Sequence, residues 1–155
     1  PKPEMDELYK KLQKKYSLPK YGELNKNFEL DYIDDPFFLL RSIRKRMHEK
    51  IVFFARIFEK IMFPNQAVMI EMYEAKFFTE KEKEDLSKIY EELLSLDRKA
   101  LALNISSTDA KEADYIKTTF KTWPKLSKKT MFIIDKLDKS WKQGKSDLTK
   151  NHYFG

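Results

Sequence analysis

Residues 35–64 read DPFFLLRSIRKRMHEKIVFFARIFEKIMFP, and their apolar pattern predicts one long α-helix. Seven apolar residues recur at steps of three or four, which places them along one stripe of a helix. These residues are Leu40, Ile43, Met47, Ile51, Phe54, Phe58 and Ile61. Asp34 and Asp35 stand where an N-cap is expected, directly before Pro36. Pro64 ends the pattern, because proline cannot continue a helix. We expect this helix, 36–62, to be the central member of the fold.

The composition favours an all-α fold. The chain has 155 residues, of which 41% are hydrophobic and 36% are charged, and only 3 are glycine. All-β and α/β folds usually need more glycine at their turns. We therefore expect an up-down antiparallel helical bundle of about five main helices, within a single domain at 1–144. An irregular strap at 17–35 and a flexible C-terminal tail at 145–155 complete the expected organisation.

Four further stretches, at about 3–16, 66–76, 80–103 and 110–142, have the apolar spacing of helices. Thr79 and Glu82 form the Thr-x-x-Glu pattern of a capping box at the start of the third stretch. Asp109 and Glu112 repeat that spacing at the start of the fourth.

Helix boundaries elsewhere are marked by asparagine, proline and glycine. Pro124 favours two helical segments that meet near Trp123, rather than one kinked helix, and Gly144 is expected to end the second segment. Asn65 is a candidate N-cap for the short helix 66–76. The residues of that helix expected to face inward are Val68, Met69, Met72 and Tyr73.

Several kinds of catalytic and cofactor site are excluded by the residues present. Gly22, Gly144 and Gly155 are too far apart for a phosphate-binding loop or a dinucleotide fingerprint. The lack of cysteine excludes thiolate catalysis and sulfur-ligated zinc. The two histidines, His48 and His152, lack the Glu-x-x-His spacing of a di-iron bundle, and no nucleophile stands at a helical spacing from His48. We therefore expect no catalytic residue, no metal and no cofactor.

The positive charge is concentrated in the outer thirds of the chain. The net charge is +6, with an excess of Lys and Arg over residues 1–50 and 104–155 and a mildly acidic middle third. Two basic groups are candidate phosphate contacts, one early in the long helix and one around Pro124. The first consists of Arg41, Arg44, Lys45 and Arg46, and the second of Lys121, Lys125, Lys128 and Lys129. Lys117 lies one helical turn before the second group.

If both groups face the same way, they predict a non-enzymatic interaction module for a polyanionic partner, RNA or a ribonucleoprotein. No sequence pattern of a base-reading domain is present, so the contacts would be mainly to phosphates. A lysine-rich solvated surface is the alternative explanation for each group taken separately.

A protein–protein adaptor or a homodimer is the competing interpretation of function. An exposed groove or homodimer seam would then be formed by Trp123, by Trp141 or by surplus Phe and Met residues on the long helix. The near-heptad spacing from Met47 to Ile61 is compatible with a partner helix from another chain. An enzyme would need acidic residues and a histidine to converge in a pocket. The residues concerned are Glu71, Glu74, His48 and the acids of 31–35.

The sequence gives no sign of a membrane partner. No apolar run approaches the roughly 20 residues that span a bilayer, and residues 1–11 contain no hydrophobic signal core. We expect a soluble, cytoplasmic protein. Tyr153 and Phe154 lie in the expected tail, either as a short peptide that docks on a partner or as a frayed end.

Overall fold

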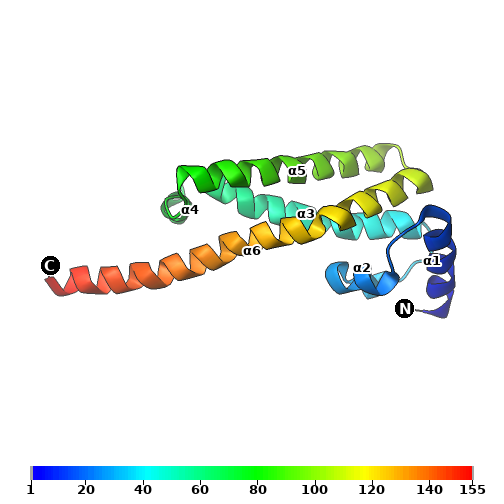
Figure 1. Ribbon diagram of the computed structural model, residues 1–155, viewed down its shortest axis with the longest axis horizontal. Coiled ribbons are helices and arrows are strands. Elements are labelled where there is room, and N and C mark those ends of the chain that lie inside the picture. The colour runs from blue at the N-terminus through cyan, green and yellow to red at the C-terminus, as the bar shows by residue number, and fades with distance from the viewer. Residues whose placement is uncertain (1, 155) are drawn as a thin grey trace. The chain divides into compact units, whose positions relative to one another are not determined.

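The computed structural model describes residues 2–154, with side chains described for 2–144. Every element in this range is a helix, as expected from the glycine-poor composition (Figure 1). The elements are α1 (Pro3–Tyr16), α2 (Tyr21–Phe28), the 3-10 helix η1 (Leu30–Tyr32), α3 (Leu39–Met62), α4 (Met69–Ala75), α5 (Glu80–Ile105) and α6 (Asp109–Phe154). The all-α prediction is confirmed, whereas an up-down order for the whole chain stays a prediction.

The chain divides into two compact units. Unit 1 comprises residues 1–53 and 92–124, and unit 2 comprises residues 54–91 and 125–155. The boundaries fall inside α3, α5 and α6, so each of these helices contributes one stretch to both units. The single domain expected at 1–144 stays a prediction. The expected flexible tail at 145–155, with Tyr153 and Phe154, lies outside the described side chains.

Unit 1 has a core to which the first half of α3 contributes most. Arg44 of α3 contacts Asn104 of α5 and Glu112 of α6, and His48 contacts Asp97, so α3 and α5 run antiparallel here. The apolar stripe expected on the long helix is buried in this unit as far as Ile51. The buried apolar residues around it include Met5, Tyr9, Leu24, Phe28, Leu30, Leu40, Ile43, Met47, Leu93, Leu96, Ile116 and Trp123.

The strap expected at 17–35 is more regular than the sequence indicated. It contains α2 and η1, whereas an irregular segment was expected. Phe28 and Leu30 are fully buried, and the ring centroid of Phe28 lies 4.6 Å from that of Trp123. These contacts make the strap part of the core of unit 1.

The start of the long helix was predicted wrongly. α3 begins at Leu39, three residues after Pro36, because Phe38 has a φ of 56° and interrupts the helical conformation. The Oδ1 atom of Asp35 accepts a hydrogen bond from the backbone N–H of Phe37 at 2.8 Å, which closes a turn before the helix. The helical hydrogen bonds then start from the carbonyl of Phe38.

In unit 2, α4 packs through one aromatic face. The ring of Tyr73 lies 5.0 Å from those of Phe77 and Trp141, and the indole N–H of Trp141 donates to Glu74 at 2.9 Å. A Cβ at Gly144 of α6 would lie 3.3 Å from the Tyr73 hydroxyl, which explains a small residue there. Other core residues of the unit are Phe58, Ile61, Phe78, Leu86, Ile89, Leu126 and Ile133.

Three residues expected to face inward from α4 are exposed instead. The exposed fractions of Val68, Met69 and Tyr73 are 40%, 87% and 40%. Asn65 makes a turn, with its Oδ1 accepting from the N–H of Ala67, and α4 starts only at Met69, so Val68 precedes the helix.

The capping box before α5 is confirmed. The hydroxyl of Thr79 accepts from the N–H of Glu82 at 3.1 Å, and the Glu82 carboxylate accepts from the N–H of Thr79 at 2.9 Å.

Replacing Thr79 by alanine is expected to lower the free energy of unfolding by about 1 kcal/mol, because the N–H of Glu82 loses its acceptor. Urea denaturation measures this change. Ser95→Ala is the matched control, since Ser95 is exposed within the same helix and its loss should change stability by less than about 0.5 kcal/mol. Equal effects of the two substitutions would contradict a stabilising cap.

The last helix differs from its prediction at three places. α6 is one helix with Pro124 inside it, although the sequence favoured two segments, and it continues past Gly144. The missing N–H of Pro124 removes a single helical hydrogen bond, and the helix persists on both sides. Its N-terminus is capped by the Thr108 hydroxyl, which accepts from the N–H of Lys111 at 3.2 Å, rather than by Asp109.

Candidate functional site

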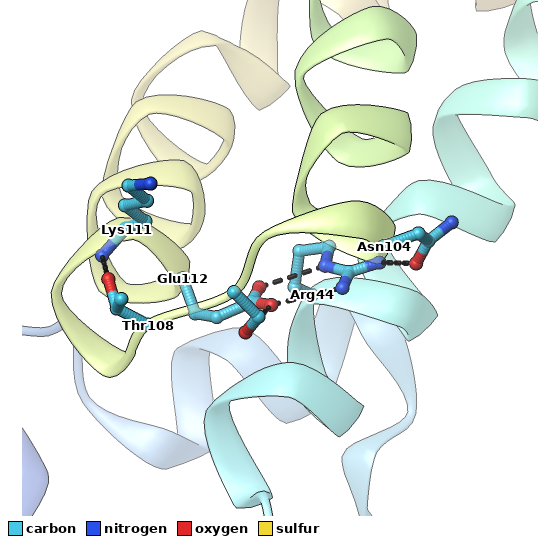
Figure 2. Close-up of polar contacts among 6 residues, drawn as sticks. Arg44, Asn104, Thr108, Lys111 and Glu112 are labelled. Carbon is cyan, nitrogen blue, oxygen red and sulfur yellow. Dashed lines mark hydrogen bonds and ion pairs between the residues drawn. The ribbon is translucent and has the colours of Figure 1, made fainter.

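Arg44, a predicted phosphate contact, is buried inside unit 1 (Figure 2). Its Nε and Nη2 atoms donate to the two carboxylate oxygens of Glu112 at 2.8 and 3.0 Å, which is a bidentate ion pair. Its Nη1 donates to Asn104 at 2.7 Å, and the Ser107 hydroxyl donates to Glu112 at 2.8 Å. Because the side chains of Arg44 and Glu112 are each 1% exposed, Arg44 cannot reach a phosphate outside the protein. The prediction for Arg44 is therefore wrong.

The positions of Arg44 and Glu112 relative to nearby apolar residues indicate that both side chains are buried, although a count of charges along the chain does not. Arg44 lies four residues after Leu40 and three before Met47, which puts it on the buried stripe. Glu112 lies four residues before the buried Ile116. A charged residue at such a position usually needs a charged partner from another helix. The sequence analysis interpreted Glu112 as part of a capping box with Asp109, and it therefore did not predict the ion pair between Arg44 and Glu112.

The other three members of the first basic group, Arg41, Lys45 and Arg46, differ in their surroundings. Arg46 lies 3.8 Å from Glu29 and 3.5 Å from Glu49, and its guanidinium lies 5.6 Å from the ring centroid of Tyr32. Arg41 is half-buried, and its buried Nε has no hydrogen-bond partner among the described residues. Lys45 is the exposed member. This group therefore presents far less free positive charge than its sequence suggests.

The second basic group is exposed on α6. Lys117 and Lys121 are exposed in unit 1, and Lys125 and Lys128 are exposed in unit 2, where Lys129 is half-buried. Within residues 2–144, no ion pair joins Lys117, Lys121 or Lys128 to a carboxylate.

Another lysine of α6, Lys136, is half-buried and forms an ion pair with Glu82. Its Nζ lies 2.6 Å from a carboxylate oxygen of Glu82 and 5.5 Å from the ring centroid of Phe78. Burial alone would raise the pKa of Glu82, but hydrogen bonds from Lys136 and from the N–H of Thr79 lower that pKa overall. Lys136 is therefore a structural residue of unit 2, and it is not part of the free basic surface.

His48 and Asp97 form a second polar contact between α3 and α5. The Nε2 atom of His48 lies 2.7 Å from the Oδ1 of Asp97, and Arg98 donates to the other carboxylate oxygen. Burial raises the pKa of Asp97, but the hydrogen bonds from His48 and Arg98 lower it overall. The contact holds both side chains against each other between two helices of unit 1.

Two of the other candidates for an enzyme site form hydrogen bonds within their own units. Glu74 accepts the indole N–H of Trp141 in unit 2, and Asp31 accepts from Asn25 and Tyr21 at the surface of unit 1. No group of three or more potential ligands for a metal ion occurs in the part of the chain that the structure describes. Nor does any helix in this part have the length and apolarity needed to cross a bilayer.

No protein-family model matches the chain, and no curated protein or solved structure is significantly similar to it. The function is therefore inferred from the residues of the chain alone. Among the predicted phosphate contacts, Arg44 and Arg46 are bound to carboxylates of the chain, and exposed lysines of α6 such as Lys121 and Lys128 are the strongest remaining candidates.

Proposed function

We propose that the chain is a non-enzymatic interaction module that binds a polyanionic partner, RNA or a ribonucleoprotein, through the lysines of α6. The observation that carries the proposal is the exposure of Lys117, Lys121 and Lys128, which form no ion pair with a carboxylate among residues 2–144. Lys117 and Lys121 are one helical turn apart, at a rise of about 6 Å, which is close to the distance between successive phosphates of a nucleic acid strand. Flexible lysine side chains suit such contacts because they follow a backbone without fixed geometry.

The proposed binding is to the backbone of the nucleic acid. Lysine acts as a point charge, and it gives little discrimination between bases. Binding of this kind releases counterions, so its affinity falls steeply with salt. Arg44 has no part in it, and Arg41, Lys45 and Arg46 would contribute less than the lysines because of their burial or their carboxylate partners.

Reversing the charge of three lysines tests this proposal. The variant with Lys117→Glu, Lys121→Glu and Lys128→Glu is expected to bind structured RNA roughly 10- to 100-fold more weakly at low salt, because three phosphate contacts become repulsive. Filter-binding titrations at two salt concentrations measure the change.

A matched variant separates position from net charge. Lys60, Lys81 and Lys88 are exposed in unit 2 and have no ion pair among the described residues, so replacing all three by glutamate changes the net charge equally. This control should retain binding within about threefold of the wild type. Equal losses in the two variants, or an absence of RNA binding by the wild type at low salt, would refute the proposal.

Binding to a protein partner is the second candidate function, and the exposed apolar residues that favour it differ from those named in the sequence analysis. Trp123 and the stripe residues Met47, Ile51, Phe58 and Ile61 are buried within the chain, and Phe54 is half-buried. The exposed fractions of Phe63, Met69 and Ile70 in unit 2 are instead 65%, 87% and 61%, which is unusual for such large apolar side chains. Sedimentation analysis distinguishes the candidates, because a dimer that resists high salt would favour the protein partner.

A further inference from the structure

We infer that unit 1 contains a binding groove for a small amphipathic anion, a carboxylate with an apolar body, between the end of α5 and the start of α6. The groove has a volume of about 610 Å³, within the range of roughly 300–1,000 Å³ typical of small-molecule sites. It is separate from Lys117, Lys121 and Lys128, which do not line it, so the inference is independent of the proposed function.

The middle of the groove is apolar. Leu103 and Tyr115 are buried and line it from α5 and α6, respectively. Ala102 and Ala110 are exposed and line it from the same two helices. Because each alanine side chain ends at its Cβ, the two helices leave space above these residues. An apolar body placed there would be removed from water on two sides, which favours binding.

The lining of the groove has a net positive charge. α5 turns back into α6 through a short connection, as Figure 1 shows, so residues beside this connection share one end. That end has Ser106 and Lys111, whose Nζ lies 3.5 Å from the Ser106 hydroxyl and forms no ion pair with a described carboxylate. The other charged lining residues are Asp114, three residues after Lys111 on α6, and Lys99 on α5. Two lysines against one carboxylate leave the lining with one net positive charge.

This arrangement selects the ligand by charge and shape together. A carboxylate at the Ser106 end would accept from the Lys111 ammonium and the Ser106 hydroxyl, two donors that face each other across the connection. A neutral alcohol would keep the apolar contacts and lose the charged one, and an amine would be repelled by Lys111.

Competition with a fluorescent probe tests the inference on the full-length chain. The dye 8-anilinonaphthalene-1-sulfonate, itself an aromatic anion, is expected to bind with a saturable fluorescence increase. Decanoate should displace it, and decanol and decylamine should do so roughly tenfold less well, the difference expected for a contact to a charged group. Failure of decanoate to compete, or equal competition by decanol, would overturn the inference.

Two substitutions locate the site. Ala110→Phe fills the groove and is expected to abolish displaceable dye binding, whereas Ala67→Phe, at an exposed alanine in unit 2, should leave it unchanged. Lys111→Gln should weaken decanoate roughly tenfold and leave decanol unchanged. Should Ala110→Phe unfold the chain, the Lys111→Gln result alone decides the matter.

The variant with Lys117→Glu, Lys121→Glu and Lys128→Glu distinguishes this site from the proposed polyanion surface. It should retain decanoate binding even though RNA binding is lost. Parallel loss of both would mean that decanoate binds the lysines of α6, and the groove would then be rejected.

Discussion

Replacing Glu112 by alanine is expected to lower the free energy of unfolding by about 3–5 kcal/mol. The substitution leaves the guanidinium of Arg44 buried without its counter-ion, and it also removes the acceptor of the Ser107 hydroxyl. An uncompensated buried charge is among the most costly defects that a single substitution creates. Since a domain is stabilised by only about 5–15 kcal/mol in total, the variant should be close to unfolding at 37 °C. Urea denaturation at 25 °C measures the loss.

Two further variants establish its cause. Glu91→Ala removes an exposed carboxylate from α5 and should change stability by less than about 0.5 kcal/mol. The double variant with Arg44→Met and Glu112→Leu removes both charges and should recover most of the lost stability, because apolar replacements of a buried ion pair are often neutral or stabilising. A loss below about 1 kcal/mol in Glu112→Ala would show that Arg44 reaches water, and its exclusion from the basic surface would then be wrong.

Replacing Phe28 by alanine is the second large expected effect, also a loss of about 3–5 kcal/mol. Phe28 is fully buried and contacts Trp123, so the substitution leaves a cavity between α2 and α6 in unit 1. The experiment also asks whether the strap at 17–35 contributes to stability. Urea denaturation followed by tryptophan fluorescence is well suited, because Trp123 is next to the altered site.

Phe37→Ala is the matched control for Phe28→Ala. Both residues belong to the segment before α3, but Phe37 is 75% exposed, and its replacement should change stability by less than about 0.5 kcal/mol. Similar small losses for both variants would mean that the strap does not pack on the core of unit 1.

The positions of most helices could be predicted from apolar spacing. The stripe from Leu40 to Ile61 is a regular 3.6-residue pattern, and the capping box at Thr79 depends only on neighbours in sequence. The start of α3 was not predictable in this way, because Pro36 is a favourable first helical residue and the positive φ of Phe38 has no sequence signal for a non-glycine residue. Apolar spacing located the helices, and local turns and caps such as those at Asp35, Asn65 and Thr108 set where they begin.

The candidate site was harder to predict because charge neutralisation is a property of the folded chain. The charge pattern alone does not distinguish Arg44 and Arg46 from free cations, since the carboxylates that bind them include Glu112 and Glu29, which are 68 and 17 residues away. Lys121 is exposed, and no acidic residue stands one helical turn away from it on the same helix face.

The salt dependence of RNA binding tests most directly whether the lysines of α6 form the phosphate-binding surface. We expect the logarithm of the observed association constant for RNA, Kobs, to fall linearly with the logarithm of the salt concentration. Replacing Lys117, Lys121 and Lys128 by glutamine should make this slope shallower by about 0.7–0.9 per lysine. The same substitution at Lys60, Lys81 and Lys88 should leave the slope unchanged. A slope that is identical in all three proteins, or that changes equally in both variants, would contradict this expectation.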